Sequence, residues 1–480
     1  MTAGRPDLAK LSVTTHSTPL AMTQDTPTLA AATTLTPPPM QRDWIAPRPN
    51  SGLMWLLGIV NRWLLLLGLP LLRSIPGLRD LPLGRGYFWI RRIDLPVADR
   101  ARLASAVNSG TAAFIGPNHP EFGTDWLMDK ELSTMVAPGM ASWADRGIVA
   151  AAPRFWGMNN LIANDGGEAA KDYSVHQAIA GAGVLLHPEG SVRWTNDVVH
   201  PLFPGIAQMA MTAAATAGDT PVFIVPVVWK YHYLTDVSSR MHREMGIIEV
   251  ALGLPVQSTL SVPLRFHSLQ RNLLADRMQH FRYEDPIGAH GFFDRQSAFQ
   301  RYLMDALEQR HASEPSHDMD KRIARMARAI RSRLTDARRD AASGDYRAAL
   351  KHDLAMVEEA KRLGEFTREV YASPMLTQEQ IFESLKRIRD RLMRKGWRNV
   401  LANMLPMPFG PRVVHVGVPE ALAVTRDGAT SGKEYEASLL ALARTRMQAA
   451  LDGINARIAP DVQRLAHENP FVGAADGAPT

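Results

Sequence analysis

Residues 111–125 read TAAFIGPNHPEFGTD, a short apolar run that leads into a proline, an asparagine and a histidine. Further along the chain, residues 183–193 read GVLLHPEGSVR, again an apolar run followed by a turn with histidine and glutamate. Short apolar runs bounded by turn residues are typical of buried strands. Both polar motifs would then lie at the carboxyl ends of strands, where open α/β sheets bind ligands. The two stretches therefore predict an α/β protein with a ligand site at one edge of its sheet.

The residue types in these motifs suit the removal of a proton from an alcohol beside a bound phosphate. His119 titrates near neutral pH and can act as a base, and Asp125 follows as a carboxylate that can orient the imidazole ring. Gly190 lets the backbone approach an anion closely, and Ser191 and Arg193 add hydrogen-bond donors. The two motifs together predict a base and an anion-binding turn in one site.

The composition is that of an ordinary globular protein with a mild positive charge. The 480 residues include 54 Lys and Arg against 48 Asp and Glu, a formal net charge of +6. This excess suits an anionic membrane surface or anionic substrates and is too small to indicate a nucleic-acid binder. The absence of cysteine excludes disulfides, thiolate metal sites and a thiol nucleophile. Residues 1–50 are rich in Thr, Pro and Ala, and we expect a disordered tail without a signal peptide.

The apolar segment 53–72 follows this tail and is a candidate membrane contact. Its length would just span a bilayer, but Arg62 lies near its middle, where a charge costs about 2.5–3.5 kcal/mol, and Pro70 shortens its second arm. We therefore expect a helical hairpin in the membrane interface, with a buried hairpin of a soluble core as the alternative. The side chains expected to meet the lipid headgroups are Trp55, Trp63, Trp89, Arg73, Arg79, Arg85, Arg91 and Arg92.

Several blocks of the chain, in order, resemble those of the glycerolipid acyltransferase family, the lysophosphatidate-acyltransferase-like enzymes. That family carries an Asn-His-x4-Asp block, an acceptor-binding block, a Phe-Pro-Glu-Gly-Thr block and a later apolar strand with a proline. Residues 118–125, 187–191 and 222–227 resemble the first, third and fourth blocks, and residues 196–207 resemble the segment after the Glu-Gly block. The resemblance covers about residues 95–255, roughly a third of the chain.

The resemblance implies an α/β fold with a mixed, mostly parallel central sheet flanked by helices. It implies transfer of a fatty acyl group from acyl-CoA or acyl-carrier protein, the co-substrate, to a hydroxyl of a lysophospholipid or glycerol-phosphate-like acceptor, without a metal or an organic cofactor. His119 would be the general base and Asp125 its orienting carboxylate, because a positioned base must take the hydroxyl proton as the attack begins. The residues expected to form the acceptor- and phosphate-binding loop are Glu189, Gly190, Ser191 and Arg193.

The chain departs from the family pattern in the spacing of the first block. Residues 120–124 separate His119 from Asp125, one residue more than the family has, so Thr124 stands at the expected carboxylate position. Three arrangements remain open. The loop bulges and Asp125 still reaches His119, or Thr124 orients the ring more weakly, or Glu121 replaces the carboxylate.

The second and third blocks depart as well. Residues 157–167, GMNNLIANDGG, lack the arginine that the family offers to the acceptor phosphate, so this role would fall to Arg193 with Arg154 or Lys171. Glu189 would orient either the loop or the acceptor hydroxyls. His187 stands where the family has phenylalanine, and we expect an aromatic packing residue with one hydrogen bond. A metal site built from His187 and Glu189 lacks a third ligand in the sequence.

Beyond the resemblance, the pattern turns helical and highly charged. An arginine-rich helix over residues 322–334 indicates a solvated face, or alternatively a docking surface for anionic lipid or an acyl-carrier protein. The capping box TQEQ at residues 377–380 predicts the start of another helix. Residues 247–255 and 412–419 compete for the role of a late strand. If the later one belongs to the sheet, residues 265–405 are a helical insertion.

The expected organisation is a disordered tail (1–50), a membrane-associated helical hairpin (51–95), an acyltransferase core (96–264), a charged helical insertion (265–405), a returning strand (406–430) and a C-terminal helix and tail (431–480). We expect the protein at the cytoplasmic face of a membrane, with membrane lipids and the acyl donor as partners and no nucleic acid. The rival hypothesis is a non-catalytic, membrane-associated binding or scaffold protein on a decayed acyltransferase fold. The shifted Asp125 and the missing arginine motivate it.

Overall fold

The computed structural model describes residues 44–64, 89–121, 123–164, 167–190, 192, 194–284, 291–314, 316–371, 373–392, 409–430 and 432–472. The predicted tail lies outside these ranges up to residue 43, and so does the second arm of the predicted hairpin, residues 65–88. Two members of the predicted phosphate-binding loop, Ser191 and Arg193, also lie outside the described residues.

Within the described ranges, eight strands form one mixed sheet in the order β1-β8-β6-β2-β5-β3-β4, with β9 paired to β6. The pairs β1/β8, β2/β6, β2/β5, β3/β5 and β3/β4 are parallel, and β8 and β9 run antiparallel to β6. The strands are β1 (Ile90–Asp94), β2 (Ala112–Pro117), β3 (Ala141–Ala144), β4 (Leu161–Ala163), β5 (Val184–Leu185), β6 (Val222–Tyr233), β8 (Arg412–Gly417) and β9 (Leu422–Val424). The predicted mixed, mostly parallel α/β sheet is therefore confirmed.

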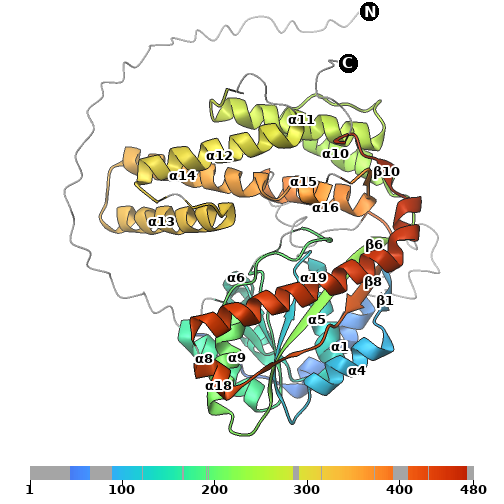
Figure 1. Ribbon diagram of the computed structural model, residues 1–480, viewed down its shortest axis with the longest axis vertical. Coiled ribbons are helices and arrows are strands. Elements are labelled where there is room, and N and C mark those ends of the chain that lie inside the picture. Colours follow the sequence, from blue (N-terminus) through green and yellow to red (C-terminus); the bar gives the residue numbers. More distant parts are fainter. Residues whose placement is uncertain are drawn as a thin grey trace, which may run out of the picture. The chain divides into compact units, whose positions relative to one another are not determined.

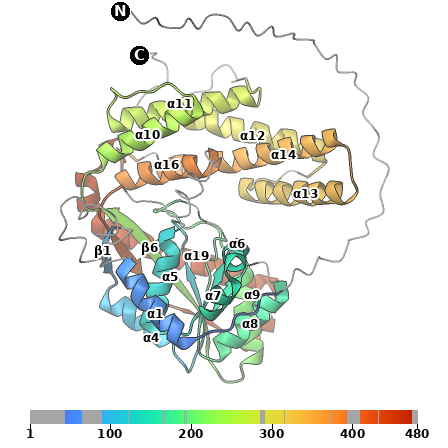
Figure 2. The same ribbon diagram turned by 180° about the vertical axis from the view of Figure 1, so that it is seen from behind.

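Helices flank both faces of this sheet (Figures 1 and 2). Along β2, Phe114 packs with α8, α9 and α19, and the next residue, Ile115, packs with α4 and α5, because successive strand residues point to opposite faces. The helices around the sheet are α1 (Ser51–Arg62), α4 (Val97–Ala106), α5 (Gly123–Val136), α6 (Arg146–Ala151), α7 (Pro153–Met158), α8 (Gly167–Ile179), α9 (Gly205–Thr216), α18 (Arg426–Thr430) and α19 (Lys433–Arg464). Both faces of the sheet are thus buried, which explains why β2 and β6 are apolar over most of their length.

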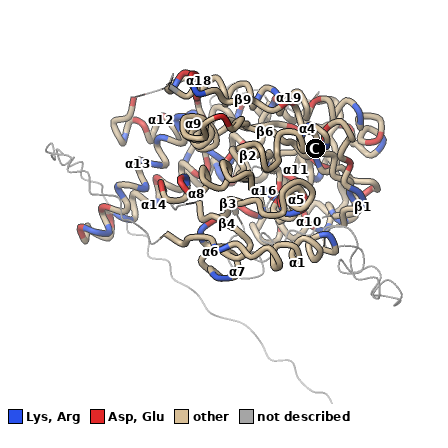
Figure 3. Tube along the Cα trace, turned by 90° about the horizontal axis from the view of Figure 1, so that it is seen from below, with Lys and Arg blue, Asp and Glu red and all other residues tan. Residues whose placement is uncertain are grey.

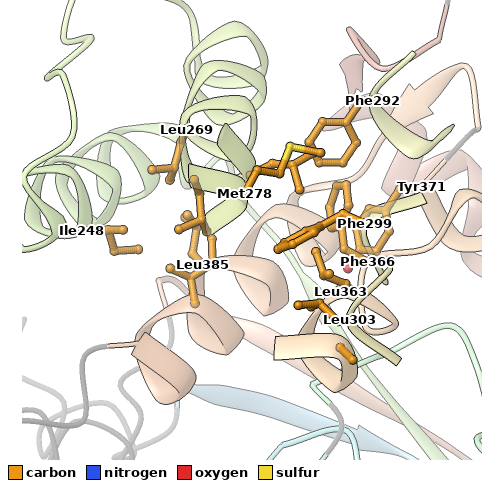
Figure 4. Packing of buried hydrophobic residues seen from close by; sticks show 14 of the residues in the cluster. Ile248, Leu269, Met278, Phe292, Phe299, Leu303, Leu363, Phe366, Tyr371 and Leu385 are labelled. Atoms are coloured by element: carbon orange, nitrogen blue, oxygen red, sulfur yellow. The ribbon is translucent and has the colours of Figure 1, made fainter. Parts of the chain in front are cut away.

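A group of helices connects β6 to β8 and has a hydrophobic core of its own, in which Leu269, Phe299 and Leu385 are buried (Figure 4). It is joined to the sheet where β6 ends, since Glu379 accepts a hydrogen bond from the Tyr233 N–H at 2.7 Å. The helices are α10 (Ser238–Leu252), α11 (Val262–His280), α12 (Phe292–His311), α13 (Met319–Arg339), α14 (Gly344–Leu363), α15 (Arg368–Tyr371) and α16 (Gln378–Leu392), and a two-stranded sheet pairs β7 (Met375–Leu376) with β10 (His467–Glu468).

The competition between the two late-strand candidates is settled by packing. Residues 412–417 form β8, between β1 and β6, so the later candidate is confirmed. The earlier candidate is wrong, because residues 247–252 form the end of α10. Its buried residues Met241, Met245 and Ile248 are spaced as on one face of a helix. The helical segment therefore begins at Ser238, well before the predicted boundary at residue 265.

The N-terminal boundary also differs from the expectation. The last residues of the predicted hairpin, 90–94, form β1 and pair with β8 inside the sheet. Trp89 is buried and lies against the guanidinium of Arg240 at 4.8 Å from the ring centroid, so it does not reach a surface as predicted for a headgroup contact. None of the helices in the described ranges is long and apolar enough to cross a membrane.

Ion pairs join several of the charged helices to one another. On α13, Arg322 binds Glu308 of α12 at 2.7 Å and Arg331 binds Glu358 of α14 at 2.8 Å. Figure 3 shows basic and acidic residues interspersed along this part of the chain. The capping box is confirmed at the start of α16, where Thr377 and Gln380 each donate a backbone N–H to the other's side chain at 3.0 and 3.2 Å.

Candidate active site

His119 and Asp125 meet where β2 ends and α5 begins. The His119 Nδ1 and the Asp125 Oδ2 lie 2.8 Å apart. Because α5 starts at Gly123, its first turn carries Asp125 back toward the histidine in spite of the extra residue between them. Of the three arrangements that the sequence left open, the structure has the first, in which Asp125 reaches His119.

Thr124 and Glu121 have a different task. Thr124 donates its hydroxyl to the Glu121 carboxylate at 2.7 Å, and the same carboxylate forms a buried ion pair with Arg412 of β8. Neither side chain is bonded to His119 in the structure. Their network joins the His119 loop to β8, two strands away from β2 in the sheet, and the backbone N–H of Glu121 lies 2.8 Å from Asp125.

The Asp125 carboxylate is fully buried and accepts hydrogen bonds on both oxygens. Oδ2 accepts from His119 and from the Glu121 N–H, while Oδ1 accepts from the Trp229 Nε1–H at 3.0 Å and from the Tyr231 hydroxyl at 2.6 Å. Trp229 and Tyr231 are two apart on β6 and so point to the same face. This set of donors fixes the carboxylate and, through it, the tautomer and orientation of His119.

Glu189 holds two loops together. Its Oε2 accepts the backbone N–H of His119 at 2.9 Å, and its Oε1 accepts the backbone N–H of His200 at 2.8 Å. Of its two predicted roles, the structure therefore supports orientation of the loop. Gly190 has φ +70°, and an added Cβ would lie 2.6 Å from the Phe203 ring, so the turn requires glycine at this position.

His187 is more than a packing residue with one hydrogen bond. Its Nδ1 lies 2.9 Å from the Asn118 carbonyl oxygen, and its Nε2 lies 3.0 Å from the Asp129 carboxylate. Its ring stacks on the His119 ring, with centroids 3.9 Å apart and planes inclined by 12°. The expectation of a single hydrogen bond is therefore wrong, because the His187 ring has a carbonyl oxygen on one side and a carboxylate on the other.

The two stacked histidines have opposite electrostatic environments. Burial and the neighbouring His187 lower the pKa of His119 well below its usual value. Burial also opposes a charge on His187, but Asp129, Asp125 and the Asn118 carbonyl outweigh it and raise the pKa of His187 to about 9. At neutral pH His119 is the neutral member of the pair and keeps a lone pair that can accept a proton. The His119 side chain keeps 17% exposure against 0% for Asp125, so the ring can be reached from solvent and the carboxylate cannot.

An aromatic cluster lies between α5 and α7, just before the residues of the second block. Trp126 packs edge-on against Trp156 of α7 with ring centroids 5.9 Å apart, and Phe155 extends this cluster. Arg154 and Lys171 were two candidates for binding the phosphate. Arg154 is exposed on α7, and Lys171 forms an ion pair with Glu168 at 2.9 Å.

Four residues of this network were missed in the sequence, although three of them left a signal. Trp229 and Tyr231 alternate along the run VVWKYHY that continues the predicted strand, a spacing that places both on one face. Asp129 follows Asp125 by one helical turn and so shares its face of α5. Arg412 gave no comparable signal, because only the tertiary fold brings β8 to Glu121.

Groups of three or more potential metal ligands do not occur in the part of the chain that the structure describes. Comparison with models of known protein families and with curated proteins found no match to the chain.

Proposed function

We propose that the protein is an acyltransferase that moves a fatty acyl group from acyl-CoA or acyl-carrier protein to a hydroxyl of a lysophospholipid or glycerol-phosphate-like acceptor. The observation that carries this proposal is the His119–Asp125 pair at the carboxyl end of β2, with both carboxylate oxygens anchored by donors from β6 and the loop. The pair resembles the base and orienting acid of a serine-protease triad without the serine, so the nucleophile must come from a substrate.

The proposed reaction needs one base and a thioester. The Asp125 carboxylate keeps the proton of His119 on Nδ1, which leaves the Nε2 lone pair to accept the proton of the acceptor hydroxyl. The hydroxyl oxygen attacks the thioester carbonyl carbon, and the tetrahedral intermediate collapses with cleavage of the C–S bond. The proton on Nε2 then passes to the leaving thiolate, so that the products are an oxygen ester and a free thiol, and His119 returns to its neutral form.

The turn at Gly190 supports an anionic acceptor. Glu189 fixes this turn directly beside the His119 backbone, and the positive φ of Gly190 makes a tight turn in which the Gly190 N–H donates to the His187 carbonyl at 3.0 Å. We propose that the acceptor phosphate binds here, with Ser191 and Arg193 as further donors. The acceptor hydroxyl would then lie toward His119.

Helix α1 supports contact with a membrane surface, which we propose to be the cytoplasmic face. It packs on α5 through Asn61, which donates to the Leu127 carbonyl at 2.9 Å, and its opposite side exposes large apolar residues. Trp55 is 65% exposed and Trp63 is 47% exposed. The other exposed apolar residues of this face are Leu56, Ile59 and Val60, and exposed Trp63 and Leu64 follow directly after the end of the helix. An apolar face with tryptophans is suited to the interfacial region of a bilayer, where a lipid acceptor and an acyl product would reside.

The test is thiol release from acyl-CoA, and then from acyl-carrier protein, across a panel of lysophospholipids and glycerol phosphate. Because the chain contains no cysteine, it adds no background to a thiol-reactive dye. We expect acceptor-dependent release that is lost in His119→Ala. A matched control is His311→Ala, which removes a buried histidine bonded to Asp353 in the helical segment, away from the sheet. No release with either donor and any acceptor would refute the proposal in favour of the non-catalytic scaffold.

A further inference from the structure

The environment of His187 requires hydrogen-bond donors on both ring nitrogens. Nδ1 faces two carbonyl oxygens, those of Asn118 at 2.9 Å and Pro117 at 3.3 Å, and carbonyls only accept. Nε2 faces the Asp129 carboxylate at 3.0 Å, an ionic partner with a side chain only 10% exposed. A histidine that donates from both nitrogens is an imidazolium.

This cation lies directly on the face of the proposed base. The His119 and His187 rings are nearly parallel with centroids 3.9 Å apart, and both are largely shielded from water. Two like charges at such a distance in a buried site repel strongly. A second proton on His119 would therefore be disfavoured as long as His187 remains charged.

We propose that His187 stays protonated through neutral pH, as an imidazolium paired with Asp129, and that it acts as a positioning residue for His119. Its charge keeps His119 unprotonated and therefore ready to accept the proton of an acceptor hydroxyl. The electrostatic part of this proposal stands on the geometry alone, and its catalytic consequence rests on the proposed function. His187 also donates to the carbonyl of the residue before His119, so the same side chain fixes the backbone that carries the base.

Other charged groups near the two rings also affect whether His187 and His119 are protonated. Asp125 is bonded to His119 and attracts the charge on His187, which favours the imidazolium, and Glu189 binds the His119 backbone. The remaining titratable groups that face this network from the loop and from the neighbouring strands are Glu121, Tyr231 and Arg412. Glu121 and Arg412 neutralise each other, so Asp129 is the acid that the structure pairs directly with His187.

The two variants that test the proposal are Asp129→Asn and His187→Phe. Asparagine retains a side chain that can bond the ring but lacks the charge that stabilises the imidazolium. Phenylalanine retains a flat ring against His119 and removes the charge altogether. Asp353→Asn is the matched control, because Asp353 is a buried carboxylate bonded to His311 at 2.9 Å in the helical segment.

The direct measurement is a pH titration of the full chain labelled with ¹³C at histidine Cε1, followed by NMR, with His119→Ala and His187→Phe used to assign the two signals. In the wild type we expect the His187 signal to keep its protonated position through neutral pH, while His119 stays neutral. In Asp129→Asn and His187→Phe the midpoint of the His119 titration should rise by about one pH unit. In Asp353→Asn it should not move.

A neutral His187 at pH 7 in the wild type would overturn the proposal, and so would a His119 midpoint that is the same in both variants and the wild type. The NMR titration needs no activity, so it decides the charge state even if the acyltransferase proposal fails. Where thiol release is observed, the acidic limb of kcat/KM should move to higher pH in both variants in parallel with the His119 midpoint. A limb that stays in place, with the loss confined to kcat, would mean that His187 acts only as packing.

Discussion

Asp125→Asn is the substitution that probes the proposed base most specifically, because it changes one oxygen to an NH2 group and leaves the shape of the site intact. The four donors around Asp125 are the His119 ring, the Glu121 N–H, the Trp229 Nε1–H and the Tyr231 hydroxyl. In either orientation the new NH2 group meets an N–H that cannot accept, that of Trp229 or that of Glu121. One N–H group is therefore left without an acceptor whichever way the asparagine turns.

Asp125→Asn should lower both the stability of the fold and the rate of the reaction. A buried donor left without its acceptor costs about 1–3 kcal/mol of stability. If the NH2 group turns toward His119, it donates to Nδ1 and moves the ring proton to Nε2, the nitrogen that must accept the substrate proton. If it turns toward Trp229, the ring keeps its tautomer but loses the negative charge that stabilises the imidazolium. We expect the rate of thiol release to fall by about 10³–10⁴-fold, as for the wrong tautomer in a histidine–aspartate pair.

The assay combines thermal unfolding with acceptor-dependent thiol release at saturating acyl-CoA. Asp353→Asn serves as the control for the loss of a buried carboxylate beside a histidine. We expect the two variants to be destabilised to a similar degree and only Asp125→Asn to lose activity. Activity of Asp125→Asn within tenfold of the wild type would show that His119 acts without its carboxylate.

Four further outcomes are expected. Gly190→Ala should lose at least about 1–2 kcal/mol of stability, because φ is +70° at this residue and the Phe203 ring fills the space of a Cβ; unchanged thermal unfolding would contradict the assigned turn. Glu121→Gln should destabilise the fold by about 3 kcal/mol, since it leaves a buried cation on β8 unpaired, and denaturant unfolding with an unaltered midpoint would oppose this. Trp55→Ser should weaken binding to anionic vesicles by about tenfold without a change in unfolding, because the side chain is 65% exposed; equal binding would remove α1 from the membrane contact. Finally, the raised pKa of His187, about 9, means that its ionisation stabilises the folded state fully below about pH 6.5 and that this contribution is lost as the pH rises through 9. The stability difference between wild type and Asp129→Asn should therefore shrink over that interval, and a constant difference would argue against a charged His187.

The sequence contained the information for the parts of the site that are local in the chain. The apolar runs at residues 112–117 and 184–185 are indeed parallel strands, and both polar motifs follow them at the same edge. The turn at Gly190 and the capping box at Thr377 were also readable, because turn and cap chemistry depends on neighbouring residues. Local patterns of this kind need no knowledge of the tertiary fold.

What the sequence did not provide depends on tertiary contacts. The run from Ile247 to Leu254 is apolar enough for a strand, and only packing on α11 and α16 shows that its buried residues belong to one helix face. Likewise, Asp125 reaches His119 because α5 begins at Gly123, a start that no residue count between the two side chains could reveal. The pairing of His187 with Asp129 joins a loop to a helix, so its charge could not be predicted from either segment alone.

The most direct test of the central claim is to identify the product of the full-length protein by mass spectrometry, using an isotope-labelled acyl thioester and a lysophospholipid in ¹⁸O-water. We expect an oxygen ester of the acceptor that carries the labelled acyl chain and no ¹⁸O, formed by the wild type and absent with His119→Ala. Labelled fatty acid containing ¹⁸O as the sole product would mean that water is the nucleophile, and an ester formed equally by His119→Ala would mean that His119 is not the base. Either result would exclude acyl transfer to the acceptor with His119 as the base.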